Sequence, residues 1–483
     1  MIDKNLDNII THLKDAYGNS GDLIIRHLTI KNKNIAYVFL ESVSSDDKIS
    51  NFLMKSISFD IKKNTYFNTL LNILKNNLVN SKVDTVTTYE EVFTKLASGY
   101  TIIFGNSFKE AITVETKSTL DRGITESSTE QIIRGPKDSF TENHMTNLGL
   151  IRKRIKDPNL WFEDITVGRR TKTKVTVAYI KDVALEKNVR EIKEKLKPID
   201  IAGIIDSGQL ITYLVSKEKT VFPKVVSTER PDLTCLNLLE GKIAILVENS
   251  PFVLIIPTVL VDFFHSSEDY YEKPLNISFS RVLRVIAFLI TILTPALYIA
   301  FTTFNQEALP DKLLISLAVQ RSTVPFPTSI EILLLLSTFE LLRESDIRTP
   351  TMMGTAISIV GALVLGDAAV AAGIVSPIVV IIVAVTSISG LLFSDIDVIN
   401  GIRWYRLLFV ILSSIAGIVG FVVALIIFIS KIASIINFGV PYLTPLSPFN
   451  LVGFKDSIIK SEKKQNKRPS YISKNTFKSG DHS

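Results

Sequence analysis

The sequence lacks most of the residues on which enzymes and metal proteins depend. Its single cysteine, Cys235, excludes an internal disulfide and a cysteine-based metal cluster, so we expect it to be a small buried apolar residue. The five histidines show no metal-ligand spacing, and the chain has no phosphate-binding loop, dinucleotide fingerprint or nucleophile elbow. The sequence therefore predicts a protein that is not an enzyme, with no catalytic residue, cofactor or metal.

The N-terminus also lacks the pattern of a secretory signal, in which a charged stretch precedes an apolar one. We therefore expect the long N-terminal region to stay on the cytoplasmic side of a membrane. The formal net charge is +6, and most of the excess lies in the basic tail, between Lys455 and Lys478. A patch this local suits anionic lipid and gives no reason to expect nucleic acid.

The second half is rich in long apolar runs. A helix needs about 20 apolar residues to cross the roughly 30 Å hydrocarbon core of a bilayer. Segments 285–306 and 407–430 meet that test without any charge, and 351–394, which contains only Asp367 as an ionisable residue, is long enough to cross twice. RWYR at 403–406 is expected to lie at the membrane surface before the last crossing. Four crossings are therefore predicted.

Segment 313–342 is ambiguous, because it mixes apolar residues with prolines and charges. The charges within it are Arg321, Glu331 and Glu340, and Arg343 follows directly after it. VPFP at 324–327 cannot continue a helix, and Thr328 with Glu331 forms a T-x-x-E capping box, so a new helix is predicted from Thr328. Glu340 and Arg343 have the spacing of an ion pair within a helix. A broken or re-entrant segment fits these features better than a fifth crossing, which is the competing interpretation.

The soluble part contains a repeat. VTVAYIKDV (175–183) matches IAYVFLESV (35–43), and LLEGKIAILVENS (238–250) matches LASGYTIIFGNS (96–107). The predicted fold is an α/β cytosolic N-terminal domain of two related α/β subdomains, followed by an α-helical polytopic membrane domain. The predicted boundaries are 1–130 and 131–278 for the two subdomains, 279–435 for the membrane domain and 436–483 for a basic cytoplasmic tail.

Glycine and alanine are dense in GALVLGDAAVAAGIVSP (361–377), and such small residues let helices approach closely within lipid. The candidates for a pore or gate are Asp367, Gly361, Gly366, Ala369 and Gly373. An ionisable residue at membrane depth commonly faces a pathway, which makes Asp367 the first candidate. The alternative is that Asp367 caps a helix.

Ordered sequence blocks over roughly 107–460 support a more specific comparison. They include RGPKDSF (134–140), NLGLIRKRIKDPNL (147–160), VGRRTKT (167–173), TERPD (228–232), SSEDYY (266–271), VPFPTSIEILLLLSTFELLRES (324–345), the block at 361–377 and PYLTPLSPF (441–449). Together they resemble the A subunit of the bacterial spore germinant receptors, the GerA family. The match is poorer before Ser107.

The resemblance implies a nutrient-sensing receptor subunit in the spore inner membrane. It also implies that the subunit oligomerises into a ligand-gated ion channel and works with a transporter-like B subunit and a lipoprotein C subunit. Arginines are suited to inter-subunit ion pairs. The candidates for subunit contacts are Arg134, Arg152, Arg154, Arg169, Arg170 and Arg230, and the alternative is a solvated basic face.

Two other functions stay open on the sequence alone. A secondary transporter would show inverted repeats with paired broken helices, and no second copy of the GALVLGDAAV break is found. A scaffold that only assembles the other subunits is the second alternative. The nutrient, the oligomer number and the position of the gate are not encoded in these patterns.

Overall fold

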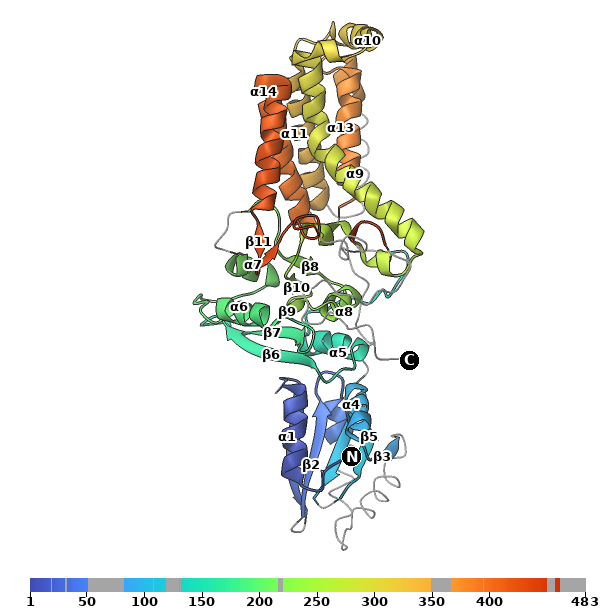
Figure 1. Cartoon of the computed structure of the whole chain (residues 1–483), viewed down its shortest axis with the longest axis vertical. Helices are drawn as coiled ribbons and strands as arrows, with labels where there is room; N and C mark the ends of the chain where they lie inside the picture. Colours follow the sequence, from blue (N-terminus) through green and yellow to red (C-terminus); the bar gives the residue numbers. More distant parts are fainter. Residues whose placement is uncertain are drawn as a thin grey trace.

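The computed structural model describes residues 1–18, 20–30, 33–50, 82–106, 108–118, 130, 132–215, 220–348, 366–393, 395–449 and 457–460. The molecule is elongated, with two α/β layers stacked below a helical bundle (Figure 1). The first subdomain, the second subdomain and the bundle follow one another along the long axis, and the chain beyond Ala433 returns to the second subdomain (Figure 1). The fold is thus two α/β subdomains followed by a C-terminal helical region, as predicted.

Each subdomain is built on a five-stranded sheet, and the two sheets have equivalent strand orders. The first is β1-β2-β4-β5-β3 and the second is β6-β7-β9-β10-β8, with every pairing antiparallel. The strands of the first are β1 Leu23–Ile30, β2 Lys33–Leu40, β3 Val83–Val86, β4 Tyr100–Gly105 and β5 Ala111–Glu115. Those of the second are β6 Leu160–Val167, β7 Thr173–Ile180, β8 Val226–Thr228, β9 Ile243–Val247 and β10 Val253–Ile256. This correspondence confirms the repeat.

Local chemistry accounts for where some of the subdomain helices begin. Helix α4 (Tyr89–Ala97) starts at a capping box, in which Thr88 Oγ1 accepts from Glu91 N while the Glu91 carboxylate accepts from Thr88 N, both at 3.3 Å. The remaining helices are α1 Leu6–Tyr17, α5 His144–Arg154, α6 Glu186–Leu196, α7 Ser207–Val215 and α8 Pro231–Leu239. Cys235 in α8 is buried, and burial raises the pKa of its thiol to about 12, as expected for a residue that only fills space.

The helical region follows two short 3₁₀ turns, Leu260–Phe264 and Ser267–Tyr270. Its helices are α9 Pro274–Ile299, which continues as a π turn to Phe304, α10 Asp311–Arg321, α11 Thr328–Arg348, α13 Pro377–Gly390 and α14 Ile396–Ala433. Among the described residues, Pro274–Phe304 and Ile396–Ala433 are long and apolar enough to cross a membrane by length and composition. A short hairpin, β11 Ile436–Asn437 with β12 Val440–Pro441, follows α14.

Helix α14 is not straight, because its backbone leaves helical geometry at Ala416 and Gly417, where Gly417 has φ 57° and ψ −133°. The rings of Tyr405 and Phe428 pack with centroids 4.9 Å apart, although a straight helix would separate these residues by about 35 Å. The chain therefore reverses at Gly417 and α14 is a helical hairpin. This corrects the prediction of one continuous crossing over 407–430: the region is helical and apolar, but its middle is a turn.

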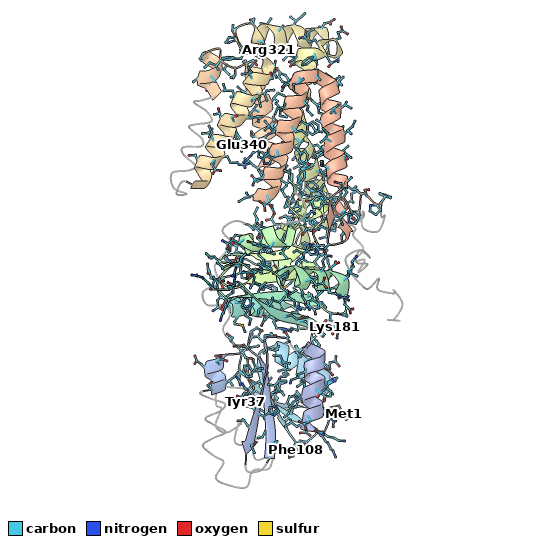
Figure 2. All side chains as sticks on the ribbon, turned by 90° about the vertical axis from the view of Figure 1, so that its left-hand side faces the viewer. Met1, Tyr37, Phe108, Lys181, Arg321 and Glu340 are labelled. Atoms are coloured by element: carbon cyan, nitrogen blue, oxygen red, sulfur yellow. The ribbon has the colours of Figure 1, made fainter. Side chains whose placement is uncertain are left out.

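The break predicted at VPFP separates α10 from α11. Helix α10 lies at the end of the bundle far from the sheets, and α11 runs back toward the sheets (Figures 1 and 2). At 1.5 Å per residue α11 is about 30 Å long, but among the described helices only those at Pro274–Phe304 and Ile396–Ala433 are both long and apolar enough to cross a membrane, so the role of 313–342 stays a prediction. The prolines end α10 without shortening the helix that follows.

Candidate functional site

The small-residue region begins, within the described residues, at Gly366. Asp367 is exposed and Ala369 is buried in the core of the bundle, while Gly361 lies outside the described residues. Gly373 has φ +67° and the following Ile374 N donates to Ala369 O at 2.9 Å, which is the geometry of a glycine that ends a helix. A Cβ at Gly373 would also lie 3.2 Å from Thr323 O, so this turn packs against the end of α10.

At the same end of the bundle, Glu331 is buried and joins α11 to α13. One carboxylate oxygen accepts from both the backbone N and Oγ of Ser376, each at 2.8 Å. The other lies 3.9 Å from Arg321 Nε of α10. The predicted capping box is therefore wrong, since no described residue gives Thr328 Oγ1 a partner and Glu331 caps α13 instead. Capping a distant helix joins two elements, which local spacing cannot reveal.

At the end nearer the sheets, the carboxylate of Glu340 forms ion pairs with three arginines on two helices. It lies 2.7 Å from Arg406 Nη2, 2.8 Å from Arg403 Nη2 and 3.7 Å from Arg343 Nη2. Figure 2 shows Glu340 well below Arg321 along the bundle. The predicted pair of Glu340 with Arg343 is present, but it is the longest of the three. Arg406 was expected at the membrane surface and is buried, because it faces Glu340 across the helix interface.

Arg152, a predicted subunit contact, lies between the two α/β subdomains. Its guanidinium is fully buried and pairs with the buried carboxylate of Asp22 at 3.0 Å, and its Nη1 donates to Leu160 O at 2.8 Å. The ring of Phe162 lies 4.5 Å below it. This corrects the prediction, because a guanidinium enclosed on all sides by its own chain is not available to another subunit.

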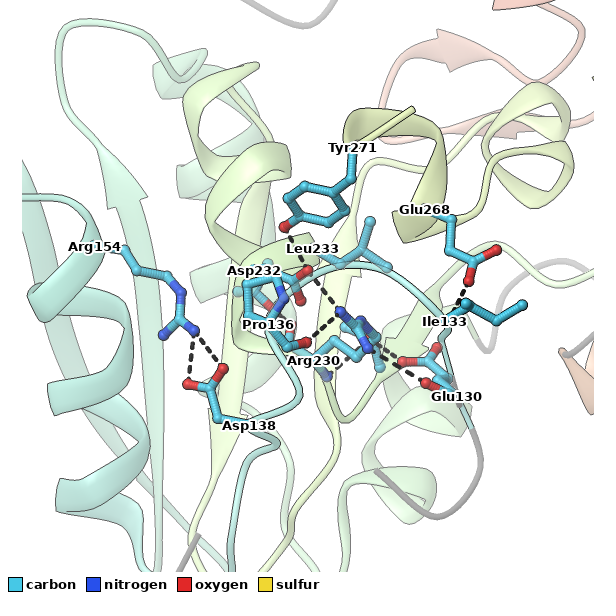
Figure 3. A network of polar contacts seen from close by, with 12 residues as sticks. Glu130, Ile133, Pro136, Asp138, Arg154, Arg230, Asp232, Leu233, Glu268 and Tyr271 are labelled. Carbon is cyan, nitrogen blue, oxygen red and sulfur yellow. Dashed lines mark hydrogen bonds and ion pairs between the residues drawn. The ribbon is translucent and has the colours of Figure 1, made fainter. Parts of the chain in front are cut away.

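Arg230 and Arg154 bind the segment that enters the second subdomain, through Glu130, Pro136 and Asp138 (Figure 3). Arg230 is buried; its Nη2 donates to Asp232 at 2.7 Å and to Pro136 O at 3.0 Å. Arg154 Nη2 donates to both carboxylate oxygens of Asp138, at 2.7 Å to Oδ1 and 2.6 Å to Oδ2. The prediction that Arg230 contacts another subunit is therefore also wrong, because Arg230 binds residues of its own chain.

The same network contains Glu130, whose carboxylate accepts from Thr228 Oγ1 at 2.6 Å. Burial raises the pKa of Glu130 to about 7, against the opposing effect of Thr228 and Arg230. Nearby, Glu268 accepts from the backbone N of Ile133 at 2.6 Å, as Figure 3 shows. The incoming segment is thus tied to the second subdomain at several points.

The three remaining arginines, Arg134, Arg169 and Arg170, are exposed. Arg169 pairs with Asp200 at 2.7 Å on the surface. These three residues are accessible, as a subunit contact requires. Their role in contacts between subunits stays a prediction.

One cluster of charged side chains was not predicted from the sequence. Arg281 and Arg284, which precede the first predicted crossing, both bind Asp269, with Nε of Arg281 at 2.9 Å and Nη1 of Arg284 at 3.0 Å. Burial works against the charged form of Asp269, and the arginines outweigh burial, so its pKa lies below the ordinary value. SSEDYY followed by RVLR contained this signal, because two acidic residues shortly before two arginines favour an ion pair.

These features define a class: a membrane-associated protein in which a tandem α/β region adjoins a bundle of apolar helices, with Glu331 and Glu340 each paired with arginine inside the bundle. Comparison with known proteins makes the class specific. The chain belongs to the Bacillus/Clostridium GerA spore germination protein family, whose model matches residues 11–471. The family inferred from the sequence blocks is confirmed.

Named relatives match almost the whole chain. Spore germination protein KA of Bacillus subtilis (strain 168) is 38% identical, with 98% of this chain and 88% of the relative covered. Spore germination protein GerLA of Bacillus cereus is 33% identical, with 98% and 96% covered. The N-terminal domain of the A subunit of the Bacillus megaterium spore germinant receptor GerK3 is a similar solved structure, 32% identical, covering 54% of this chain and 97% of that one with a TM-score of 0.43.

Proposed function

We propose that this chain is the A subunit of a nutrient-sensing germinant receptor. It is non-enzymatic, resides as a multi-pass protein in the spore inner membrane with its α/β subdomains in the cytoplasm, and oligomerises to form or gate a channel that releases ions when a nutrient arrives. Its partners are a transporter-like B subunit and a lipoprotein C subunit. Family membership over nearly the whole chain is the observation that carries this proposal.

The geometry of the bundle supports a membrane role. The α14 hairpin starts and ends near the second subdomain: Gly401 packs against Phe222, and beyond Ala433 the backbone O of Ile436 accepts from Lys224 Nζ at 3.0 Å. Both ends of this hairpin therefore lie on the side of the soluble subdomains. Its arms, 396–415 and 418–433, are about 30 and 24 Å long, which is near the thickness of the hydrocarbon core.

The proposed gate lies in the small-residue region. Asp367 is exposed on the surface of the single chain, where it is free to face a neighbouring subunit and a shared pathway, while Ala369 on the same turn packs inward. A carboxylate on a pathway concentrates cations, whereas an exposed carboxylate facing hydrocarbon would cost at least about 2.5 kcal/mol. The proposed oligomer provides the polar surroundings that Asp367 needs.

Asp367→Asn tests this role. We expect slower release of monovalent cations from spores after nutrient addition, with receptor levels unchanged, because the substitution removes the charge and keeps the shape. The matched control is Asp311→Asn, the same change at an exposed position in α10. Release from Asp367→Asn spores at the rate of the control, with equal subunit levels, would reject Asp367 as a pathway residue.

A further inference from the structure

The bundle carries an unbalanced charge cluster where it meets the soluble subdomains. Arg343, Arg403 and Arg406 converge on the single carboxylate of Glu340. Gly401, two residues before Arg403, packs against Phe222 of the second subdomain. In a membrane, the cluster therefore lies at the depth of the headgroups facing the soluble subdomains.

The cations outnumber the anion that holds them. Among the described residues, three guanidinium groups share one carboxylate, and the exposed Glu344 also acts on Arg343, so these five charged groups sum to a net positive charge. Each guanidinium has five N–H donors, so pairing with Glu340 leaves most of them unused. Arg403 is partly exposed, and no described residue accepts from its Nε.

A small cavity lies behind these cations, with a volume of about 20 Å³. Its walls include Arg343, Arg403, Arg406 and Ser387. Ser387 is buried, and within the described part of the chain its Oγ has no hydrogen-bond partner. The cavity has room for about one water-sized group, such as one phosphate oxygen. It therefore offers unused donors to an oxygen that enters between the arginines.

The surface around the cavity is apolar and exposed. Trp404, beside Arg403, is 63% exposed, and Leu391 and Ile388 at the end of α13 are 64% and 66% exposed. Leu341, one residue after Glu340, is 72% exposed. Tryptophan marks the interface of membranes, and the leucines and isoleucine suit acyl chains. Leu391 both lines the cavity and is exposed, so the cationic cavity borders an apolar surface, as a headgroup with acyl chains requires.

We propose that Arg343, Arg403, Arg406 and Ser387 bind the phosphate of an anionic phospholipid in the leaflet that faces the soluble subdomains. One phosphate oxygen enters the cavity and accepts from Ser387 and the guanidinium donors, and the acyl chains lie along Leu391, Ile388 and Trp404. Arginine forks match phosphate geometry, and pairing at low dielectric favours this anion over a zwitterionic lipid. The proposal rests on the membrane location proposed above and is independent of channel activity.

The test uses the full chain in nanodiscs, with retained lipid counted by native mass spectrometry. We expect phosphatidylglycerol to be retained in preference to phosphatidylcholine of the same acyl chains. Arg403→Gln should weaken that preference about fivefold, which corresponds to the loss of one cation near an anionic surface. Glu340→Gln should strengthen it, because the competing carboxylate is gone. Arg169→Gln, which removes one positive charge from the soluble surface, should leave it unchanged.

Several outcomes would overturn the proposal. Equal retention of the two lipids, or equal losses in Arg403→Gln and Arg169→Gln, would show that no specific site exists. Displacement of the lipid by millimolar inorganic phosphate would assign the site to free phosphate. A chain that inserts normally yet shows no preference refutes the lipid site alone, whereas a chain that retains no lipid of either kind refutes the membrane location.

Discussion

The molecule has two junctions, and they are built differently. Between the two α/β subdomains the joint is polar: Arg152 pairs with Asp22, and Ser20 and Ser42 donate to the same carboxylate at 2.8 and 2.7 Å. Trp161 closes the contact by donating to Ala16 O at 3.0 Å. The apolar core clusters of the two subdomains do not run together across the described residues of this joint.

Between the second subdomain and the bundle, the joint has a shared apolar core, beside which Asp269 pairs with Arg281 and Arg284 of α9. Phe222, Leu260 and Phe264 belong to the same core cluster as the bundle residues Phe288 and Tyr405. Around this core, Tyr442 Oη donates to Pro223 O at 2.7 Å and Asn437 Nδ2 donates to Lys224 O at 2.6 Å.

This difference indicates which parts move together. A shared hydrophobic core is not easily divided, so we expect the bundle and the second subdomain to move together. The first subdomain is joined to the second by hydrogen bonds and the enclosed Arg152–Asp22 pair, so we expect this joint to be the more sensitive to loss of a single polar group.

The largest expected effect comes from breaking the polar joint. Arg152→Met leaves Asp22 buried without its counter-ion, which should cost about 3–5 kcal/mol of unfolding free energy. Urea titration of the full chain in detergent, followed by Trp161 fluorescence in a Trp404→Phe background, measures this loss, because Trp161 lies at the joint and the chain has two tryptophans.

Arg169→Met is the matched control, since Arg169 and Asp200 form an ion pair whose side chains are 71% and 70% exposed. Its effect should stay below about 1 kcal/mol. The double variant Asp22→Leu with Arg152→Met should recover part of the loss, because it leaves no unpaired charge. Equal effects of Arg152→Met and Arg169→Met would contradict the importance assigned to the buried pair.

A second, smaller effect concerns the segment between the subdomains. Because burial raises the pKa of Glu130 to about 7 from 4.5, the folded chain binds this proton more tightly than the unfolded chain does. The contribution is fully present below pH 4.5 and is lost as the pH rises through 7. Between pH 5 and pH 8 the unfolding free energy should fall by about 2 kcal/mol from this group. Glu130→Gln should flatten that part of the urea stability profile, and an unchanged profile would refute the assignment.

The smallest effect is expected at the apolar joint, with the opposite sign. His265 Nε2 donates to Ser457 O at 2.6 Å, and burial, with the charge of Arg281, lowers the pKa of His265 below 6.5. The unfolded chain therefore takes up this proton first, so stability present above pH 6.5 is lost as the pH falls. Asp262 and Asp269 partly offset the added charge. His265→Gln should reduce the loss of thermal stability between pH 7 and pH 5; an equal loss would exclude His265 as its source.

The local features were predictable because their causes are local. Helices over 89–97 and 186–196, the strands around 35–43 and 175–183 and their repetition follow from capping residues, alternation and turn signals. Glu340 with Arg343 could be paired from spacing alone, since residues three apart share a helix face.

Partners far apart in the chain were not predictable in the same way. Arg152 and Asp22 are separated by 130 positions, and nothing in their neighbourhoods specifies the pairing. The turn at Gly417 was hidden for another reason: the apolar run is continuous through it, and hydropathy does not distinguish one long helix from two arms that fold back.

The sequence by itself determined the family, the repeated α/β unit and the presence of apolar helices, because composition, periodicity and ordered motifs are properties of the chain alone. Tertiary structure decided which charges are enclosed, which arginines stay free for other molecules and where the last apolar run reverses. Those outcomes depend on which surfaces meet, since a buried charge must find its counter-ion wherever packing brings one.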